Sequence, residues 1–578
     1  MMEEKKFDRN YFENYANNGP YEHKHFLEFN QSVAKVIKTR LNPGKLLDVG
    51  CARGFLVSAL RGQKISAFGI DISEYAIDNA LEDIRAYCRK LSVTDPLEDE
   101  YDLITCIEVM EHLPDGEAKC AIANICGHTD TVLFSSSSNF MHPDVTHINQ
   151  HLPEYWVDLF ARFGFELDKN FDAGFISKDA MKFSRKIFSI TFLIPGLDVS
   201  GGVKVILEYC NNLVQRGHLV NVLSLSSSTP DWFDLNPSVR IIETDQDSYV
   251  KLLPISDILI ATLSDTVPLV YNAPKKAGQK YYFIQHLEPL VHPGMKFMYA
   301  YGLPLQKMTV SKWLKNIIEE NTHDRVELVS LGINHEQLYP EPSLRQRYDK
   351  KSIRIGMVYS QLLFKGAEDG MKSIALVKKQ YKNAKCILMG TQPKPAKVTC
   401  DEYWHNPQQQ NLNEFYNSCD IFISASWLEG FGLPSLEAMS CKCVVACTDQ
   451  KGNRDYAINE ETALVSPIQK NELLTANIIR LIEDKRLCAL LRENAYNKAV
   501  SFNWDESAQK MLSFFIRTYK FKKPTDLLVE KLNCEMLQLH KENQSLCYQI
   551  SQLKKTTSWK ITAPIRFVGN FIRKLKLR

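Results

Sequence analysis

The chain has 578 residues, too many for one hydrophobic core, and this length predicts about three to four domains. Its apolar content of 44% and its charged content of 24% are ordinary values for a globular protein. The formal net charge of +2 argues against a dedicated nucleic-acid binder, so we expect no nucleic-acid partner.

Fifteen cysteines are scattered along the chain. Their one cluster, Cys441, Cys443 and Cys447, lies in a segment that alternates like a strand, and no cysteine pair at zinc spacing follows it. This distribution predicts reduced, mostly buried thiols rather than disulfides or a metal site.

The N-terminus and the hydropathy of the chain bear on its location. MMEEKKFDRN lacks the apolar core of a signal peptide. No stretch reaches the about 20 apolar residues that a membrane-spanning helix needs. We therefore expect a protein of the cytoplasm, or one attached to the cytosolic face of a membrane.

The first α/β pattern begins at Lys45 with KLLDVGCARGFLVSAL. It reads as a strand over 46–49, a turn that contains Gly50 and Gly54, and a helix. A second strand, AFGIDIS, ends at Asp71, where a carboxylate can accept hydrogen bonds from both hydroxyls of a ribose. The segment SVTDPL and a further strand, YDLITCIEVMEHL, extend the pattern of a doubly wound domain. A Rossmann-like binder of another nucleotide stays open on these residues alone.

The motif DVGCARG resembles the DxGCGxG motif of class I S-adenosylmethionine-dependent methyltransferases, although Arg53 stands where many members have a small residue. The resemblance implies a Rossmann-like domain, which we expect over 1–184, with S-adenosylmethionine as its cofactor. In such a domain Asp71 would hold the ribose and Asp95 would lie near the adenine. The residues assigned to the cofactor on this basis are Asp48, Gly50, Cys51, Gly54, Asp71, Ile72, Asp95 and Glu108.

Methyl transfer to a hydroxyl needs a general base or a positioned acceptor, because an unactivated alcohol is a poor nucleophile. Glu111 and His112 follow the YDLITCIEVMEHL strand. His147 and His151 lie in DVTHINQHLPEYW, which resembles acceptor-side sequence of methyltransferases found alongside polysaccharide enzymes. The candidate catalytic groups are Glu111, His112 and His147, and a structural role for each histidine stays open. After them, GFELDKNF reads as a closing strand and KDAMKFSRK as a charged connector.

A second α/β pattern begins at Ile187. FSITFLIPGL reads as a strand, VSGGVKVILEYCNNLVQRGH as a glycine turn and an amphipathic helix, and LVNVLSL as the next strand. Gly201 and Gly202 lie at that turn, where backbone N–H groups can contact a diphosphate. A later strand, QKYYFIQ, leads into His286.

The pattern restarts at SIRIGMVYS, which predicts two consecutive doubly wound domains, over 187–345 and 346–520. The second contains SASWLEGFGLPSLEAM, in which 420–424 predicts a buried strand and EGFGLP predicts a loop. Ser435 reads as the start of a helix whose N–H groups face the same place. This is the geometry of a phosphate site at the carboxyl edge of a parallel sheet.

The stretch EGFGLPSLEAMSCKCVVA resembles the E-x7-E motif of retaining GT-B glycosyltransferases that use nucleotide sugars. The resemblance implies that Glu429 faces the hydroxyls of the donor sugar and that Glu437 binds the ribose of the nucleotide. Lys365, in FKG, would neutralise the leaving diphosphate. His286 matches an acceptor-side position, and a plain loop histidine stays open.

These assignments complete the expected transfer site. The candidate catalytic residues on this basis are Glu429, Lys365 and His286. The residues assigned to the nucleotide sugar are Gly201, Gly202, Lys365, Gly430, Phe431, Gly432, Leu433, Ser435, Leu436 and Glu437. No metal motif stands at a strand end and the family requires none, so we expect metal-independent transfer with retention.

The sequence departs from this family pattern at Ser360, five residues before Lys365, where members usually carry an arginine. One cation is therefore missing or comes from elsewhere, for example from Arg454 in DQKGNRDY. The departure leaves open a GT-B part that binds carbohydrate without catalysis.

A heptad pattern covers 525–556. It places leucine in one seam position and a single asparagine among apolar residues in the other: Leu532, Leu539, Leu546 and Leu553, with Val529, Met536, Asn543 and Ile550. This arrangement predicts a parallel two-stranded coiled coil and hence a homodimer, with one packed amphipathic helix as the alternative.

The last residues, 557–578, combine basic with aromatic and aliphatic side chains on a segment too short to span a membrane. They predict an interfacial anchor to anionic lipid, and RNA binding stays open. SWKITAPIR also resembles tails on bacterial polysaccharide glycosyltransferases.

Together these features predict a bifunctional α/β enzyme of bacterial surface-polysaccharide assembly, a context that rests on resemblance. It would transfer a sugar and a methyl group to a lipid-linked glycan at the cytosolic face of the inner membrane, where fusion raises the local concentration of the second enzyme. The alternatives are an active methyltransferase with a non-catalytic GT-B scaffold, an assembly hub built on the coiled coil, and methylation of a small molecule or lipid.

Overall fold

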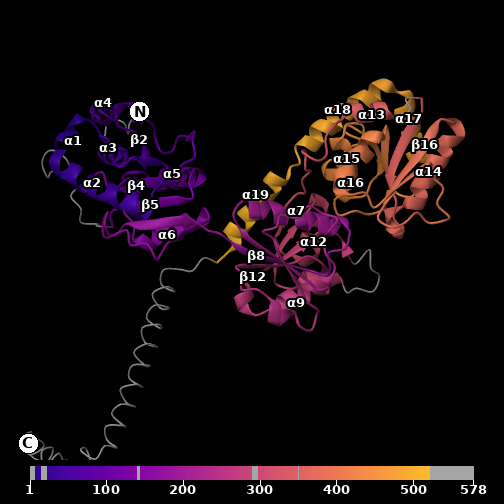
Figure 1. Ribbon diagram of the computed structural model, residues 1–578, viewed down its shortest axis with the longest axis horizontal. Helices are drawn as coiled ribbons and strands as arrows, with labels where there is room; N and C mark the ends of the chain where they lie inside the picture. Colours follow the sequence, from indigo (N-terminus) through magenta and orange to yellow (C-terminus); the bar gives the residue numbers. More distant parts are fainter. Residues whose placement is uncertain (1–6, 15–22, 139–143, 289–296, 349–350, 521–578) are drawn as a thin grey trace, which may run out of the picture. The chain divides into compact units, whose positions relative to one another are not determined.

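The computed structural model describes residues 7–14, 23–138, 144–288, 297–348 and 351–520 (Figure 1). The residues from Ile187 to Tyr519 form one compact unit, and the described residues before Ile187 form another. The predicted coiled coil over 525–556 and the predicted basic tail over 557–578 lie outside the described residues.

The first unit is built on a seven-stranded sheet with the order β3-β2-β1-β4-β5-β7-β6. Strands β1 to β5 pair in parallel, whereas β7 runs antiparallel to both of its neighbours. The strands are β1 Lys45–Val49, β2 Ser66–Asp71, β3 Cys88–Lys90, β4 Leu103–Ile107, β5 Thr131–Ser135, β6 Phe165–Leu167 and β7 Met181–Arg185. This order is the doubly wound arrangement that the first α/β pattern predicts.

The sequence predicts that the segment KDAMKFSRK is a connector. This prediction is wrong, because most of the segment forms β7. Met181 and Phe183 point into the core, and Lys182, between them, pairs with Asp168 at 2.7 Å. Only two residues of β7 point inward, and charged residues lie between and after them. The alternation of apolar and polar residues that marks a strand is therefore weak in this segment.

Helices cover both faces of this sheet. Because successive strand residues point to opposite faces, Leu46 enters one core and Leu47 the other. The first core includes side chains of α2 and α3, and the second includes side chains of α5 and α6. The helices are α1 Arg9–Asn14, α2 His23–Arg40, α3 Phe55–Gly62, α4 Glu74–Asp78, α5 Asp115–Gly127 and α6 Pro153–Arg162.

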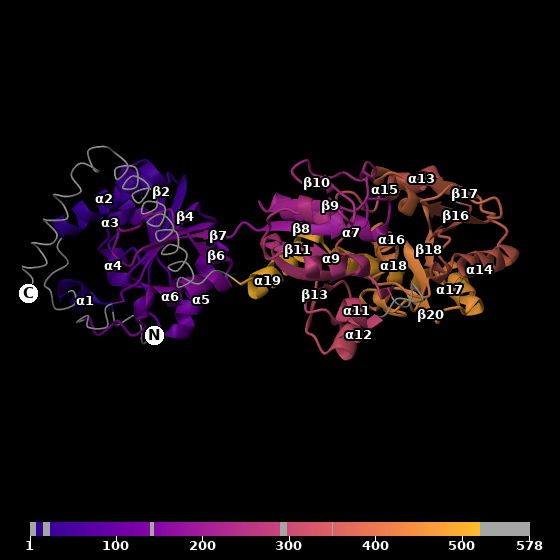
Figure 2. The same cartoon turned by 90° about the horizontal axis from the view of Figure 1, so that it is seen from below.

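The second unit contains two further parallel sheets, drawn in magenta and in orange in Figure 2. The second sheet has the order β10-β9-β8-β11-β12-β13-β14 and the third has the order β17-β16-β15-β18-β19-β20. Strands of the second sheet are β8 Ser189–Ile194, β9 Leu219–Ser224, β10 Arg240–Glu243, β11 Ile258–Ala261, β12 Gln279–Ile284, β13 Gln306–Thr309 and β14 Val326–Leu328. Strands of the third sheet are β15 Ile353–Val358, β16 Ala384–Gly390, β17 Glu402–His405, β18 Ile421–Ser424, β19 Val444–Thr448 and β20 Leu464–Ser466.

Helices of the second unit alternate with these strands, as the repeated α/β pattern predicts. They are α7 Gly201–Gln215, α8 Tyr249–Leu252, α9 Val267–Asn272, α11 Phe297–Gly302, α12 Lys312–Thr322, α13 Pro342–Arg347, α14 Ala367–Gln380, α15 Gln409–Ser418, α16 Leu433–Ser440, α17 Asn471–Glu483, α18 Lys485–Val500 and α19 Trp504–Thr518.

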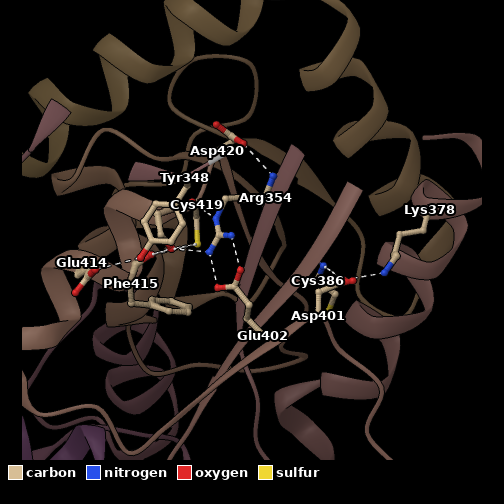
Figure 3. A network of polar contacts seen from close by, with 11 residues as sticks. Tyr348, Arg354, Lys378, Cys386, Asp401, Glu402, Glu414, Phe415, Cys419 and Asp420 are labelled. Carbon is tan, nitrogen blue, oxygen red and sulfur yellow. Dashed lines mark hydrogen bonds and ion pairs between the residues drawn. The ribbon is translucent and has the colours of Figure 1, made fainter. Parts of the chain in front are cut away.

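The edge strand β17 is one that the sequence analysis does not anticipate. Its Glu402 receives both terminal nitrogens of Arg354, at 2.5 and 2.6 Å, across the intervening strand β16 (Figure 3). Arg354 also donates from Nε to the Ser418 carbonyl at 2.7 Å, and its side chain is only 4% exposed. This buried fork fixes the edge strand through a contact that no local pattern reveals.

The last described helix, α19, returns to the second sheet. Phe515 packs on Phe188 and Tyr281, with ring centroids 6.4 and 5.0 Å apart. Gln279, at the start of β12, donates to the Thr518 carbonyl at 2.8 Å. The chain from α18 to α19 therefore links the two sheets of this unit, while the predicted boundaries at 345 and 520 stay predictions.

The structure bears on two sequence predictions, one about the state of the cysteines and one about membrane-spanning helices. The described cysteines are free thiols, and Cys441, Cys443 and Cys447 are buried, as expected. Within the described part of the chain, no helix combines the length and apolar character that crossing a membrane requires.

Candidate functional site

The first site is a cavity of about 470 Å³ at the carboxyl edge of β1, β2 and β4. The sheet order places the turns after these three neighbouring strands together, which is where doubly wound folds bind ligands. Six of the residues assigned from the sequence line this cavity: Asp48, Gly50, Cys51, Asp71, Ile72 and Glu108.

The turn after β1 is shaped by Gly50 and held by Asp71. Gly50 has φ 73°, and a Cβ there would stand 2.4 Å from a methyl carbon of Val109. Asp71 accepts hydrogen bonds from the Ala52 N–H and the Ser73 N–H, each at 2.8 Å. The carboxylate at the tip of β2 therefore fixes two backbone turns around the cavity.

Asp48 is a buried acid beside this turn. Burial, together with the charge of Asp71, raises its pKa to about 7, although the Thr105 hydroxyl donates to it at 2.7 Å. Burial also raises the pKa of Asp71. Two acids that are costly to ionise in an apolar cavity favour a ligand that brings positive charge. S-adenosylmethionine carries a sulfonium and an ammonium group, so the residues present fit it.

Two of the residues assigned to the cofactor do not line the cavity. Gly54 has φ 75°, and a Cβ there would meet Ile84 at 2.4 Å, so this glycine serves the packing of the turn. Asp95 is exposed, and Leu91, Ser92 and Val93 line the cavity instead. The segment SVTDPL thus reaches the site through its beginning rather than through its acid.

An aromatic wall completes the cavity and was missed in the sequence. It comes from the segment before β1 and comprises Phe7, Tyr11, Phe12, Phe26 and Phe29. Ser73 donates to the Phe7 carbonyl at 2.6 Å, which attaches this segment to the turn after β2. The signal in the sequence is the recurrence of aromatic residues in KKFDRNYF, which lies far from the glycine turn.

Three candidate catalytic groups meet in one place. Glu111, His112 and His147 have ligand-type atoms that all lie within 4.8 Å of one another, and both histidines line the cavity. Glu111 accepts from the Ser136 hydroxyl and the Ser137 N–H, at 3.0 and 3.3 Å.

A cluster of one carboxylate and two histidine rings is also typical of a metal site. Burial raises the pKa of Glu111 well above its usual value, and the charge of Glu108 raises it further. A bound cation would favour the ionised carboxylate and lower this pKa, so Glu111, His112 and His147 could together hold a metal ion. The expected independence of a metal stays a prediction.

The second site lies between the two sheets of the second unit and includes the motif EGFGLPSLEAM. The sequence predicts that the helix starts at Ser435. In the structure helix α16 begins two residues earlier, at Leu433. Gly432, with φ 87°, occupies the N-cap position, and Pro434 lies in the first turn, where its missing N–H costs nothing. The Ser435 N–H donates to the Gly432 carbonyl at 3.2 Å.

Gly430 has a role other than ligand approach. A Cβ on Gly430 would stand 1.8 Å from the carbonyl oxygen of Gln285, which follows β12. The EGFGLP loop of the third sheet therefore touches the carboxyl edge of the second sheet, backbone against backbone. Only glycine permits this approach.

Each glutamate of the motif is held by a lysine. Lys365 Nζ lies 2.9 and 2.8 Å from the two carboxylate oxygens of Glu429. Lys204, on α7, donates to Glu437 at 2.6 Å, and the Tyr416 hydroxyl donates to the other oxygen of Glu437 at 2.6 Å. Residues from both halves of the unit therefore meet at Glu437.

Lys204 is the cation that the sequence analysis missed. It lies one turn into α7, the helix that starts at Gly201 and is capped by Ser200. Burial opposes its charge, but Glu437 raises its pKa above the usual value. The neighbouring Glu208 has a pKa raised to about 7 by burial, so Glu437 is the main charge partner of this lysine.

The remaining assigned residues are close by. Gln285 donates to the Gly202 carbonyl at 3.2 Å, which joins the second sheet to the start of α7. The ring of His286 packs on Phe364, next to Lys365, with centroids 5.6 Å apart. Phe431 is buried, as are Leu436 and Ser435.

The substitute cation considered for Ser360 is committed elsewhere. Arg454 donates to both oxygens of Asp449, at 2.8 and 2.6 Å, and this pairing lowers the pKa of Asp449 to about 2. Ser360 itself accepts from the Leu362 N–H at 3.2 Å. Beside Lys365 at Glu429, the further cation that the structure brings to the motif is Lys204 at Glu437.

Two family models match the chain. Residues 21–170 match the family described as methyltransferase domain, and residues 344–498 match the family described as glycosyl transferases group 1.

Three curated proteins are similar to parts of the chain. The first is an N,N'-diacetylbacillosaminyl-diphospho-undecaprenol alpha-1,3-N-acetylgalactosaminyltransferase of Campylobacter jejuni, with 24% identity over 242 residues, 39% of this chain. The second is a ubiquinone biosynthesis O-methyltransferase of Methylococcus capsulatus, with 36% identity over 111 residues, 17% of this chain. The third is the capsular polysaccharide biosynthesis glycosyltransferase CapM of Staphylococcus aureus, with 24% identity over 205 residues, 32% of this chain. The matches span 63%, 45% and 54% of these relatives' own lengths.

Proposed function

We propose that this chain, which carries a methyltransferase domain and a GT-B group 1 glycosyltransferase domain, is a bifunctional transferase. One site would move a methyl group from S-adenosylmethionine to a hydroxyl, and the other would move a sugar from a nucleotide donor. The observation that carries the proposal is that each domain has its own buried acidic site at the carboxyl edge of a parallel sheet.

In the methyltransferase site, Asp48 and Asp71 would hold the cationic end and the ribose of the cofactor. When bound, S-adenosylmethionine supplies the electrophilic methyl group. Asp48, whose pKa burial raises to about 7, gains a compensating charge when a cation binds. The aromatic wall around Phe7 and Phe12 excludes water from the reacting groups.

In the glycosyltransferase site, Glu429 and Glu437 would bind the donor sugar and the ribose. Donor binding then requires Lys365 and Lys204 to exchange a carboxylate for the diphosphate, whose charge grows as it leaves. The N-terminus of α7 at Gly201 and Gly202 would contribute N–H groups to the same anion. Lysine charge and helix N-terminus together support diphosphate departure without a metal.

The acceptor of both reactions is proposed to be one lipid-linked glycan. The printed names of two relatives support this choice, since one acts on an undecaprenol-linked acceptor and the other serves capsular polysaccharide biosynthesis. Two transferases on one chain work at high local concentration on one acceptor.

The sequence after 520 supports a further part of the proposal. The heptads of 525–556 favour a homodimer, and the basic residues of 557–578 favour attachment to the cytosolic face of the inner membrane. Sedimentation of the chain ending at Lys523, and flotation of the full chain with anionic vesicles, test the two parts separately. A truncated chain that still dimerises, or a full chain that stays off the vesicles, would contradict them.

Incubation with a membrane glycan fraction tests the activities. The fraction comes from a strain that lacks this chain, and the full chain is added with methyl-labelled S-adenosylmethionine or with a labelled nucleotide sugar. We expect both labels to enter the glycan. Failure of either label across the common nucleotide sugars would refute that activity.

A second candidate function is favoured by Ser360, which stands where members of the GT-B family usually carry an arginine. In this alternative the GT-B part binds carbohydrate and only the methyl label enters the glycan. The sugar label therefore decides between the two functions.

A further inference from the structure

A buried ion pair joins the two sheets of the second unit. Lys204 lies near the start of α7, which follows β8 of the second sheet, and its Nζ donates to Oε1 of Glu437 at 2.6 Å. Glu437 lies near the start of α16, which follows β18 of the third sheet. The two side chains are only 16% and 7% exposed, so little solvent screens the attraction between them. The contact therefore holds together the starts of two helices from different sheets.

The space beside this pair is too small for a nucleotide. Lys204, Glu208 and Glu437 help to line a cavity of about 10 Å³, which is the space of about one water molecule. Tyr416 donates to Oε2 of Glu437 at 2.6 Å, so both oxygens of this carboxylate already have a partner. The ribose that the proposed function assigns to Glu437 therefore displaces Lys204. The lysine then carries its positive charge away from Glu437 but remains attached to α7.

The N-terminus of α7 gives the displaced charge a second partner. The Ser200 side chain accepts from the Val203 N–H at 3.1 Å, whereas the N–H groups of Gly201 and Gly202 have no partner within the helix. The proposed function places the diphosphate at this N-terminus. Lys204 follows Gly202 by two residues, so its ammonium group can reach an anion that is held there.

Negative charges around Lys204 explain why a diphosphate needs this cation. Glu437 faces it from α16. Glu208 lies four residues later on the same helix, where burial raises the pKa of the Glu208 carboxyl to about 7 and the charge of Lys204 opposes that rise. A diphosphate that enters beside these acids is repelled unless a cation lies between them. Lys204 attracts both acids and is therefore placed to shield the diphosphate from them.

Lys365 is the contrasting cation of the motif. Its Nζ lies 2.9 and 2.8 Å from the two oxygens of Glu429, and its side chain is 32% exposed. Both residues of that pair follow strands of the third sheet, and a ribose at Glu437 does not have to break it. The pair of Lys204 and Glu437 is thus the one that opposes the nucleoside itself.

We propose that Lys204 is a specificity-determining residue, which makes the donor site select nucleoside diphosphate compounds over nucleosides. The inference rests on the proposed glycosyltransferase function and concerns donor binding alone. A nucleoside breaks the pair with Glu437 and leaves the lysine without its buried partner, which costs free energy. A diphosphate takes the place of the carboxylate beside Lys204 and so restores the charge pairing. The same lysine therefore opposes one ligand and stabilises the other.

Isothermal titration calorimetry of the full chain measures both effects. UDP, GDP, ADP, CDP and dTDP are screened first, and the diphosphate that binds most tightly is then compared with its own nucleoside. We expect Lys204→Met to weaken binding of the diphosphate by about 10-fold or more and to bind the nucleoside more tightly than the wild type does. Lys204→Arg, which keeps the charge, should retain most of the preference for the diphosphate.

Three further variants separate this selection from a general effect on the site. Lys204→Gln can still donate a hydrogen bond to Glu437 but lacks the charge, so it should fold like the wild type and lose the preference for the diphosphate. Lys365→Met should weaken binding of the diphosphate without tightening binding of the nucleoside. Lys372→Met, an exposed change in α14, should alter neither affinity.

Several results would overturn the inference. Unchanged binding of the diphosphate by Lys204→Met and Lys204→Gln would remove the lysine from the diphosphate site. Equal losses for the diphosphate and the nucleoside would indicate a structural role. Weaker binding of the nucleoside alone would show that Lys204 assists the ribose instead of competing with it. If the wild-type chain binds none of the five diphosphates, the proposed glycosyl transfer fails instead.

Discussion

Replacing the buried acid Asp48 by asparagine should stabilise the cofactor-free protein at neutral pH. In the folded chain the pKa of Asp48 is raised from 3.8 to about 7, because burial disfavours its charge. In the unfolded chain this acid ionises near its ordinary value. The folded state therefore binds a proton more tightly, and stability falls as the pH rises from about 4 to about 7.

The size of the effect follows from the shift. About three pKa units correspond to a loss of about 4 kcal/mol above pH 7. Asparagine carries no charge, and its side-chain oxygen can still accept the Thr105 hydrogen bond. Asp48→Asn should thus raise the melting temperature of the methyltransferase unit at pH 8 by up to roughly 10 °C. The gain should shrink as the pH falls toward 5.

Differential scanning fluorimetry of the full chain at pH 5 and pH 8, with and without S-adenosylmethionine, measures the stability of the cofactor-free protein and its stabilisation by the cofactor. The cofactor should stabilise the wild type more than the variant, since a bound cation compensates an ionised Asp48. Asp78→Asn, an exposed change in α4 of the same unit, is the matched control. A variant that melts earlier at pH 8, or that shifts equally at both pH values, would refute the reasoning.

Three further predictions concern the second unit. Lys365→Met should lower sugar transfer by at least about 100-fold and leave methyl transfer unchanged; comparable sugar transfer would remove this lysine from the mechanism. Gly430→Ala places a Cβ 1.8 Å from the Gln285 carbonyl oxygen and should cost about 1–3 kcal/mol in thermal unfolding. Gly302→Ala, with open space around it, should be near neutral. Arg354→Met leaves Glu402 without its buried cation and should lower the free energy of unfolding in denaturant by about 3 kcal/mol. Lys378→Met, which breaks the more exposed ion pair with Asp401, should lower it by less than about 1 kcal/mol. Equal costs for the two arginine and lysine changes would contradict the buried fork.

Much of the fold could be predicted from the sequence, because parallel strands buried on both faces appear as short apolar runs between glycine turns and amphipathic helices. The segments around β1, β8 and β18 were identified in this way. Strands β7 and β17 were not, since each lies at or near an edge and carries charge on the outer face. Arg354 reaches Glu402 across 48 residues of sequence, and no local pattern encodes that distance.

The sites show the same division between local and long-range information. Gly50, Asp71, Glu429 and Glu437 follow from motifs in which backbone shape and side-chain charge are adjacent in sequence. Lys204 meets Glu437 only because two sheets face each other, and its sequence context reads as an ordinary amphipathic helix. The start of α16 was misplaced because a proline and a glycine cap the helix more effectively than the serine that follows them.

The meeting of Glu111, His112 and His147 lies furthest from what sequence can show. Glu111 and His112 follow β4, whereas His147 lies in the later segment DVTHINQHLPEYW. Only the fold brings the ligand-type atoms of these three side chains within 4.8 Å of one another.

The central claim is that one chain adds a sugar and a methyl group to one glycan. Mass spectrometry of the surface glycan from the source organism, with and without this chain, tests it most directly. The account predicts that the glycan lacking the chain loses both one sugar residue and one O-methyl group, and that the wild-type chain restores both. A glycan that is unchanged, or that loses only one of the two groups, would contradict it.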